Sequence, residues 1–317
     1  DLHPVNRRQH QMCIRDRYME VKLGMSPISW TNDDLPELGG DTSLETCLKE
    51  TRLAGFSGTE LGGKFPKTPS SLKEVLEEHE LKLISGWYSG TMLNNNLKDE
   101  KIKLDETLNL FAEVGASVLV YGETFNTVQN KKNKPLNSRP RLSEFDIKQY
   151  GQDLGDLADY CLDKGVPLTF HHHMGTAVET QNEIEQLMNS TRDSVGLLLD
   201  TGHLLFADGD YDKIISNYGD RINHIHTKDI RKDVFKNVDK SKDSFLDCVL
   251  DGVFTVPGDG CIDYRKFIKR LKDIRYKGWI VIEAEQDPLK ANPFEYAKKG
   301  FNTLVSCLEE YDFKIVA

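Results

Sequence analysis

The sequence has no apolar run approaching the roughly 18 consecutive residues that a transmembrane helix requires. It also has few cysteines, six in 317 residues, and no two of them form a CxxC pair. Scattered cysteines are typical of reduced thiols in the cytosol and do not suit a disulfide framework or a zinc knuckle. Together, these absences predict a cytoplasmic protein without a membrane segment.

Positive charge is also scarce. The 41 Lys and Arg residues are outnumbered by 51 Asp and Glu residues, which gives a formal net charge of -10. A nucleic-acid or membrane surface needs clustered cations, so this balance argues against both partners. No glycine-rich turn of the dinucleotide type follows the first expected strand, and no glycine-rich phosphate cradle precedes a helix. A small organic molecule is therefore the expected partner.

The beginning of the chain differs from the rest. Residues 1–17 contain four arginines and two histidines but no apolar stretch of the kind found in a signal peptide. We interpret residues 1–20 as a disordered extension or an artefact of the gene start, with a basic interaction arm as the alternative. The chain is 38% hydrophobic, and residues 21–317 are long enough to form one large domain.

From residue 21 onward, β-rich runs alternate with amphipathic segments. This alternation predicts a parallel sheet with right-handed crossovers, and eight units in about 290 residues fit an α/β fold of the closed (β/α)8, or TIM, barrel type. An open doubly wound sheet is the alternative. The expected strands are residues 21–30, 58–61, 81–88, 117–123, 165–175, 195–200, 222–229 and 278–285, and the expected helices are residues 44–54, 69–79, 101–114, 144–164, 179–189, 211–218, 264–274 and 293–311.

Two irregular segments interrupt this rhythm. Residues 125–141 are basic and contain two prolines, and we expect them to form either a lid or a solvated loop. Residues 231–263 form a long loop rich in Asp and Lys. Because barrels often pair through helices or extended loops, residues 231–251 are the predicted contact region of a homo-oligomer.

The fifth expected strand ends in three consecutive histidines, His171, His172 and His173. Successive side chains of a strand point to opposite faces, so His171 and His173 share one face while His172 faces away. The active site of such a barrel lies at the carboxyl ends of the strands. We therefore expect two imidazoles to converge there and His172 to be structural.

Polar side chains also end the other expected strands. A mixed shell of imidazoles and carboxylates with open positions suits Mn²⁺, Co²⁺, Fe²⁺ or Mg²⁺ better than a closed structural zinc site. The alternative is that these groups pair with one another, although a buried array of carboxylates needs a cation to offset it. The residues are Trp30, Glu60, Trp87, Tyr88, Glu123, Asp200, His203, His224, His226, Lys228, Glu283 and Glu285.

Part of this set resembles a known metal shell. Asp200-Thr201-Gly202-His203, His226 and Glu283 are similar to the ligands of the xylose-isomerase-like TIM barrels, whose members generally end strand five in a glutamate, where this chain has His171. Further motifs make the chain resemble the inosose dehydratases of that superfamily over nearly all of residues 21–308. These motifs are HHHMGT (171–176), YGE (121–123), HTKDIR (226–231) and VPGDG (256–260).

The resemblance implies a lyase that dehydrates a cyclitol ketone, 2-keto-myo-inositol (scyllo-inosose), to a trihydroxycyclohexane-1,2-dione in inositol catabolism. It also implies a divalent cofactor, Mn²⁺ or Co²⁺. A metal-dependent sugar isomerase or epimerase of the same superfamily is the alternative activity, although an isomerase would be expected to carry Glu at the position of His171. The implied metal ligands are His171, Asp200, His226 and Glu283, with His173 as the alternative to His171.

The remaining candidates are assigned to proton transfer and to the substrate. The proton-transfer candidates are Glu123, His173, Lys228 and Glu285, with a salt bridge between Lys228 and Glu285 as the alternative for that pair. Core packing is the alternative for the two tryptophans among the substrate candidates, and a capping role is the alternative for Glu60. The substrate-binding candidates are Trp30, Glu60, Trp87, His203 and Arg231.

Overall fold

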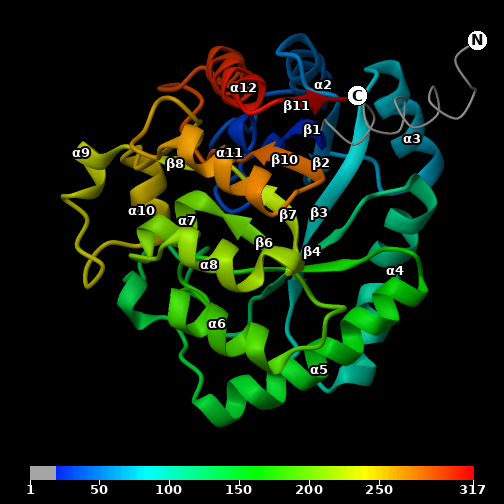
Figure 1. Ribbon diagram of the computed structural model, residues 1–317, viewed down its shortest axis with the longest axis vertical. Coiled ribbons are helices and arrows are strands. Elements are labelled where there is room, and N and C mark those ends of the chain that lie inside the picture. Colours follow the sequence, from blue (N-terminus) through cyan, green and yellow to red (C-terminus); the bar gives the residue numbers. More distant parts are fainter. Residues whose placement is uncertain (1–18) are drawn as a thin grey trace, which may run out of the picture.

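Eight short strands form a closed parallel barrel in the computed structural model, which describes residues 19–317 (Figure 1). Each strand pairs with the next, and β10 closes the barrel on β1, from Val21 opposite Gly278 to Met25 opposite Ile282. This confirms the predicted (β/α)8 fold. The barrel strands are β1 (Met19–Met25), β2 (Gly58–Leu61), β3 (Lys82–Gly90), β4 (Leu119–Glu123), β5 (Leu168–His171), β6 (Gly196–Asp200), β7 (Ile222–His226) and β10 (Gly278–Ile282).

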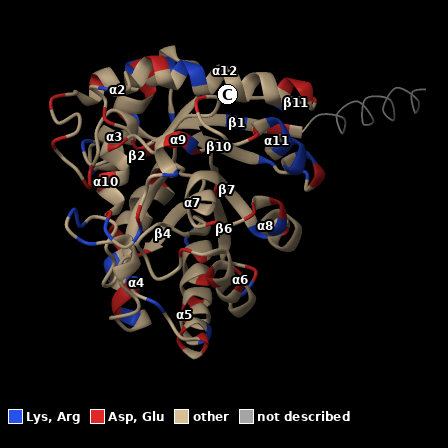
Figure 2. Ribbon diagram, turned by 90° about the vertical axis from the view of Figure 1, so that its left-hand side faces the viewer, with Lys and Arg blue, Asp and Glu red and all other residues tan. Residues whose placement is uncertain are grey.

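Helices follow the strands and surround the barrel (Figure 1). Several begin at side-chain caps; for example, the Asn96 side chain accepts a hydrogen bond from the Asp99 amide, which starts α4 four residues before the predicted helix. Charged residues lie mainly on the helices and loops (Figure 2). The main helices are α2 (Leu44–Leu53), α3 (Pro69–Glu78), α4 (Leu97–Val114), α5 (Glu144–Asp163), α6 (Gln181–Ser190), α8 (Tyr211–Tyr218), α11 (Tyr264–Asp273) and α12 (Pro293–Glu310).

Several short elements were not expected from the sequence. The predicted 231–263 loop contains two small helices and one strand of an antiparallel hairpin, β8 with β9, and its apolar residues join a separate hydrophobic cluster. The expected first strand ends early, because a 3-10 turn, η1 (Pro27–Ser29), follows β1. The other short elements are η2 (Leu136–Ser138), α7 (Thr201–Phe206), η3 (Gly219–Arg221), β8 (Asp229–Ile230), α9 (Lys232–Phe235), α10 (Phe245–Leu250), β9 (Phe254–Thr255) and β11 (Phe313–Ile315).

Residues alternate along the strands between two apolar layers. Leu197 and Leu199 belong to the large cluster that the strands share with the helices, whereas Leu198 joins Val118 and Val120 in a small separate cluster. Alternate strand residues face the helices or the barrel interior. Leu198, Val118 and Val120 therefore face the barrel interior. This alternation fixes which polar residues at the strand ends can point into the barrel.

The predicted extension, residues 1–20, lies outside the described residues up to residue 18, while Met19 and Glu20 belong to β1. The last strand, β11, pairs with the beginning of β1, where Val21 lies opposite Ile315. Among the helices within residues 19–317, none combines the length and the apolar character that crossing a bilayer would require.

Candidate active site

A cavity of about 500 Å³ opens at the carboxyl ends of the strands. Imidazoles and carboxylates form one part of its wall, and the β1–α2 loop and the segment after β4 form another. Of the predicted site residues, His171, His173, His226, Glu60, Glu283, Glu285 and Trp87 line it. Lys131 of the predicted lid segment also lines it, and the lining residues that the sequence did not single out include Asp33, Asp34, Thr127 and Gln129.

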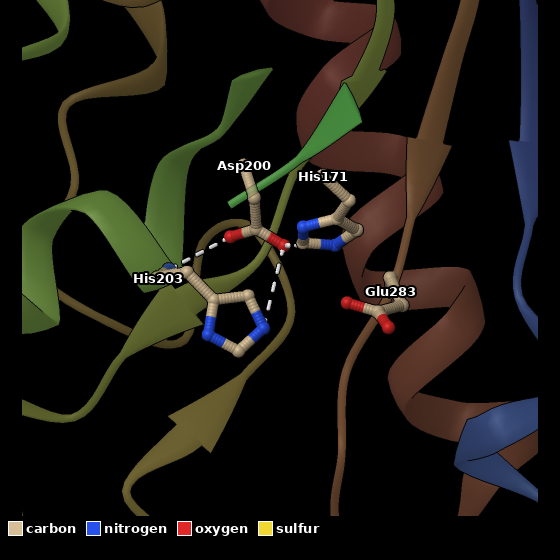
Figure 3. Close-up of side chains that lie close together, drawn as sticks. All are labelled: His171, Asp200, His203 and Glu283. Atoms are coloured by element: carbon tan, nitrogen blue, oxygen red, sulfur yellow. Dashed lines mark hydrogen bonds and ion pairs between the residues drawn. The ribbon is translucent and has the colours of Figure 1, made fainter. Parts of the chain in front are cut away.

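Side chains from neighbouring strands converge at this cavity. His171, Asp200, His203 and Glu283 point toward one another from β5, β6, α7 and the residue after β10 (Figure 3). Their ligand atoms all lie within 4.8 Å of one another. The inward alternation places His171, Asp200 and Glu283 there, because they follow the outward apolar residues Phe170, Leu199 and Ile282, whereas His203 reaches the same point from α7.

The chemistry of these groups fits a divalent cation. His171 Nε2, Asp200 Oδ2 and His226 Nδ1 are all buried without a hydrogen-bond partner, and Glu283 Oε2 is buried in an ion pair with the Lys228 ammonium at 2.7 Å. His226 Nδ1 lies 3.6 Å from Asp200 Oδ2 and 3.5 Å from Glu283 Oε2, and His171 Nε2 lies 3.9 Å from Asp200 Oδ2. Ligands bound at about 2.1 Å to one ion have separations of about 3 to 4 Å. These three separations fall within the range expected for one metal shell.

His171 and Asp200 each use one atom for structure and keep another free. His171 Nδ1 is hydrogen-bonded to the His172 carbonyl at 2.5 Å, which leaves Nε2 as the atom facing Asp200. Asp200 Oδ1 accepts a hydrogen bond from the His203 amide and caps α7, which leaves Oδ2 free. A side chain held through one atom presents the other in a fixed direction.

His203 is close to the four predicted ligands but differs from them. Its Nε2 lies 3.9 Å from Asp200 Oδ2, and it accepts a hydrogen bond from the Lys228 ammonium at 2.8 Å. The lone pair of His203 Nε2 therefore accepts this hydrogen bond and does not face a metal ion. His203 is fully buried and does not line the cavity, so its position does not agree with the predicted contact to a substrate.

Lys228 lies behind two glutamates that line the cavity. Its ammonium is fully buried and contacts Glu285 Oε2 at 2.5 Å, Glu283 Oε2 at 2.7 Å and His203 Nε2 at 2.8 Å. Three contacts use its three N–H donors. This geometry favours the salt bridge, which was the alternative to direct proton transfer for Lys228.

His173 and Glu285 are the proton-transfer candidates that reach the cavity. His173 Nδ1 is hydrogen-bonded to the Met174 carbonyl at 2.8 Å, so Nε2 is the nitrogen with a free lone pair. Burial lowers the pKa of His173 to about 4. Burial, with the neighbouring Glu283, raises the pKa of Glu285 to about 8, although the Lys228 ammonium opposes this shift.

Glu60 at the end of β2 contacts two histidines of β7. Its Oε1 lies 3.0 Å from Nε2 of both His224 and His226 and accepts a hydrogen bond from the Ser85 hydroxyl at 2.7 Å. Although burial alone would raise it, the two imidazoles hold the pKa of Glu60 well below its usual value. The sequence singled out Glu60 and His224 separately, but their contact with each other joins strands that are far apart in the chain.

Trp30 and Arg231 differ from their predicted roles. The Trp30 indole is buried in the main core and donates to Glu50 Oε2 at 2.6 Å, because the chain turns at Pro27 before it can extend the strand. Arg231 holds the β8–β9 hairpin through the Gly252 and Phe254 carbonyls and Asp259. Neither residue lines the cavity, so the structure does not support their assignment to the substrate.

Glu123 points away from the cavity. It follows Tyr121 in the outward alternation of β4, whereas Val120 faces inward and lines the cavity. The two Glu123 oxygens accept the amides of Phe125 at 3.0 Å and Leu93 at 3.3 Å. Burial raises the pKa of Glu123 to about 7. The structure therefore does not support the predicted catalytic role of Glu123, because its side chain lies on the outward-facing side of β4.

The basic segment 125–141 contributes to the cavity wall through Thr127, Gln129 and Lys131. It is held against the loop after β5 and the first turn of α6, because the buried Arg139 guanidinium contacts Glu179 of the loop at 3.2 Å and Glu183 of the helix at 2.8 Å. The predicted lid thus lies beside the cavity, although its lining residues could not be recognised from an irregular sequence.

Comparisons with known proteins show the family to which the chain belongs. Residues 48–307 match the family model of the xylose isomerase-like TIM barrel. The rhizopine catabolism protein MocC of Rhizobium meliloti is 44% identical over 95% of this chain and 93% of its own length. The inosose dehydratase of Clostridium beijerinckii is 43% identical over 89% of this chain and 95% of its own length.

Solved structures share the fold at lower identity. The IOLI protein with a bound zinc atom is 19% identical, with a TM-score of 0.63 over 92% of this chain and 98% of that chain. A D-allulose 3-epimerase from Methylomonas sp. is 18% identical, with a TM-score of 0.64 over 91% of this chain and 98% of that chain. The chain belongs to the xylose isomerase-like TIM barrel family and, within it, to the group of sequences that includes the inosose dehydratases and MocC.

Proposed function

We propose that this protein is a hydro-lyase, an inosose dehydratase, which removes water from 2-keto-myo-inositol and forms a trihydroxycyclohexane-1,2-dione. The observation that carries the proposal is the 43% identity to an enzyme named inosose dehydratase over 95% of that enzyme's length. The cavity supports it, because about 500 Å³ accommodates a six-membered cyclitol ring and its wall carries both acids and bases.

His171, Asp200, His226 and Glu283 would hold a divalent ion, for which we propose Mn²⁺ or Co²⁺. The unpartnered buried atoms of His171, Asp200 and His226 support this assignment. A bound ion would act as a Lewis acid on the ketone and on the enediolate that forms from it. Lys228 fixes Glu283 from behind, which leaves the carboxylate little freedom to turn away from the other three ligands.

We assign the two proton transfers to His173 and Glu285. Dehydration needs a base that removes the proton next to the ketone and an acid that protonates the departing β-hydroxyl. Nε2 of His173 has a free lone pair and can accept the carbon-bound proton. Glu285, whose Oε2 accepts from the Lys228 ammonium, would carry the proton on Oε1 and deliver it to the hydroxyl, which leaves as water. Return of the proton from His173 to Glu285 through solvent restores the starting state.

The test is a direct assay of the purified protein with scyllo-inosose. We expect ultraviolet absorbance to rise as the conjugated dione forms, to disappear after treatment with a chelator, and to return on addition of Mn²⁺ or Co²⁺. Interconversion of keto-sugars without this absorbance would identify the isomerase or epimerase instead. Full turnover after complete removal of metal would contradict the metal part of the proposal.

A second candidate substrate comes from the relative MocC, which is named a rhizopine catabolism protein and is 44% identical. This identity is similar to that of the dehydratases, so the family alone does not separate the two substrates. The assay should compare scyllo-inosose with rhizopine at equal concentrations. A much higher kcat/KM for rhizopine would replace inosose as the substrate.

We further propose that the protein acts in the cytoplasm. The cysteines of residues 19–317 are all free, and four of these five are buried, as expected for a chain that stays reduced. The predicted homo-oligomeric contact through residues 231–251 stays a prediction, which size-exclusion chromatography with light scattering can test.

A further inference from the structure

The carboxylate of Glu60 contacts Nε2 of His226, on the edge of the ring that is turned away from the proposed metal shell. We infer that Glu60 is a positioning residue that orients the metal ligand His226, and that it is not a ligand of the substrate. This inference rests on the proposed metal site. Glu60 would act on the metal only through its ligand His226.

The two ring nitrogens of His226 have different partners. Nε2 lies 3.0 Å from Glu60 Oε1, which is hydrogen-bond distance. Nδ1 has no hydrogen-bond partner and lies 3.6 Å from Asp200 Oδ2 and 3.5 Å from Glu283 Oε2. A carboxylate at Nε2 favours the tautomer with its proton there, so the lone pair stays on Nδ1, toward the shell. Glu60 would thereby fix both the tautomer and the direction of the ring.

Glu60 is itself held in place from two other strands. The Ser85 hydroxyl of β3 donates to Oε1 at 2.7 Å, and Nε2 of His224 in β7 lies 3.0 Å away. The Glu60 side chain is 8% exposed. Three contacts on one buried oxygen leave the carboxylate a single favourable position, as a residue that orients a ligand requires.

The same contacts argue against two other roles. A substrate hydroxyl would have to compete at Oε1 with donors that are already in place. Glu60, His224 and His226 could also be considered as ligands of a second ion. However, both imidazole nitrogens are at hydrogen-bond distance from the same oxygen, so N–H groups occupy the space between them.

The test measures metal binding without substrate. Glu60→Gln should raise the Kd for Mn²⁺ by roughly 10- to 100-fold, as is usual when the hydrogen-bond partner of a ligating histidine is altered. Isothermal titration measures the Kd, and the visible absorption of the Co²⁺-loaded protein reports a changed ligand field. At saturating metal, the KM of the variant should stay close to the wild-type value.

Glu100→Gln is the matched control. Glu100 is also a fully buried glutamate that accepts several hydrogen bonds, among them those of Tyr121 and the Thr91 amide, and it is not among the cavity-lining residues. This variant should keep the wild-type Kd for Mn²⁺ and the wild-type Co²⁺ spectrum. Ser85→Ala removes one support of Glu60 and should weaken Mn²⁺ binding in the same direction by a smaller factor, even where Glu60→Gln fails to fold.

Four outcomes would overturn the inference. An unchanged Kd with a strongly raised KM would make Glu60 a substrate ligand. A second Mn²⁺ per chain that is lost in both Glu60→Gln and His224→Asn would make it a ligand of another ion. A wild-type protein that binds no divalent ion would remove the proposed metal site and this inference with it, whereas equal binding by wild type and Glu60→Gln would remove this inference alone.

Discussion

Two buried polar clusters lie near the carboxyl ends of the strands, and they differ in how their polar atoms are satisfied. In the inner cluster, which consists of His171, Asp200, His226 and Glu283, one buried atom on each of the first three residues has no hydrogen-bond partner, and Glu283 Oε2 is paired with the Lys228 ammonium. The outer cluster, Glu100, Tyr121, Glu123 and Tyr150, lies between the barrel and its helices, and in it the Tyr150 hydroxyl lacks a hydrogen-bond partner. Its two carboxylates accept hydrogen bonds from Tyr121 and from the amides of Thr91, Leu93 and Phe125.

Both clusters combine burial with shifted pKa values. Burial raises the pKa of Asp200 in the inner cluster and of Glu123 in the outer one. Three inner residues, His171, His226 and Glu283, also line the cavity, whereas no outer residue does. Burial and a shifted pKa therefore do not identify a catalytic group by themselves; free lone pairs beside a cavity are the stronger evidence.

The largest effect is expected from removing one ligand of the inner cluster. Asp200→Asn should lower kcat by roughly 1000-fold or more, because a Lewis acid supplies several kcal/mol of transition-state stabilisation. Turnover and metal content measure this. In contrast, Glu100→Gln in the outer cluster should change kcat by less than about twofold and reduce the free energy of unfolding by about 1–3 kcal/mol. Comparable losses of activity in both variants would contradict the distinction between the clusters.

The next effect concerns the residues that line the same wall as the inner cluster. His173→Ala and Glu285→Gln should each lower kcat by roughly a hundred- to ten-thousand-fold while metal content stays unchanged. His172→Ala is the control, because His172 is fully buried and does not line the cavity. It should keep bound metal and most activity. Metal loss in His173→Ala would instead make His173 the ligand from the end of β5.

A pH-dependent effect on stability is expected from the outer cluster. The pKa of Glu123 is raised to about 7 in the folded protein, so the native state binds more protons than the unfolded state between the ordinary glutamate pKa and that value. Its contribution to stability is therefore greatest at low pH and is lost as the pH rises toward 7, by roughly 3 kcal/mol at most.

Urea unfolding between pH 5 and pH 8 measures this loss. In Glu123→Gln the pH dependence over this interval should be flatter than in wild type, while kcat stays within about twofold because no reacting group is removed. An unaltered pH dependence would show that Glu123 titrates normally. A large loss of kcat would return Glu123 to the list of catalytic residues.

The smallest effect is expected at Trp30. Trp30→Phe removes the hydrogen bond to Glu50 and should lower the free energy of unfolding by about 1 kcal/mol. The KM should not change, because Trp30 is buried outside the cavity. Denaturant unfolding and steady-state kinetics test the two parts, and a raised KM would restore the predicted contact with the substrate.

Much of the fold and of the inner cluster could be predicted from the sequence, because both depend on local rules. Alternating strand and helix patterns indicated the eight units, and two-residue alternation placed His171 and Glu283 on inward faces. Asp200 was recognisable because it ends an apolar strand. These features need only the chain direction and the period of a strand.

Other roles depended on partners that are distant in the sequence. To assign Glu123, one has to know which residues of β4 face the barrel interior. Val120 does, so Glu123, three residues later, faces outward. Arg231 binds Asp259, 28 residues later, and Glu60 meets His226 across 166 residues. The sequence by itself thus determined the barrel and the set of chemical groups at its mouth. Only the tertiary structure decided which of those groups face the cavity and which support the others, because such contacts form between strands that the chain does not place next to each other.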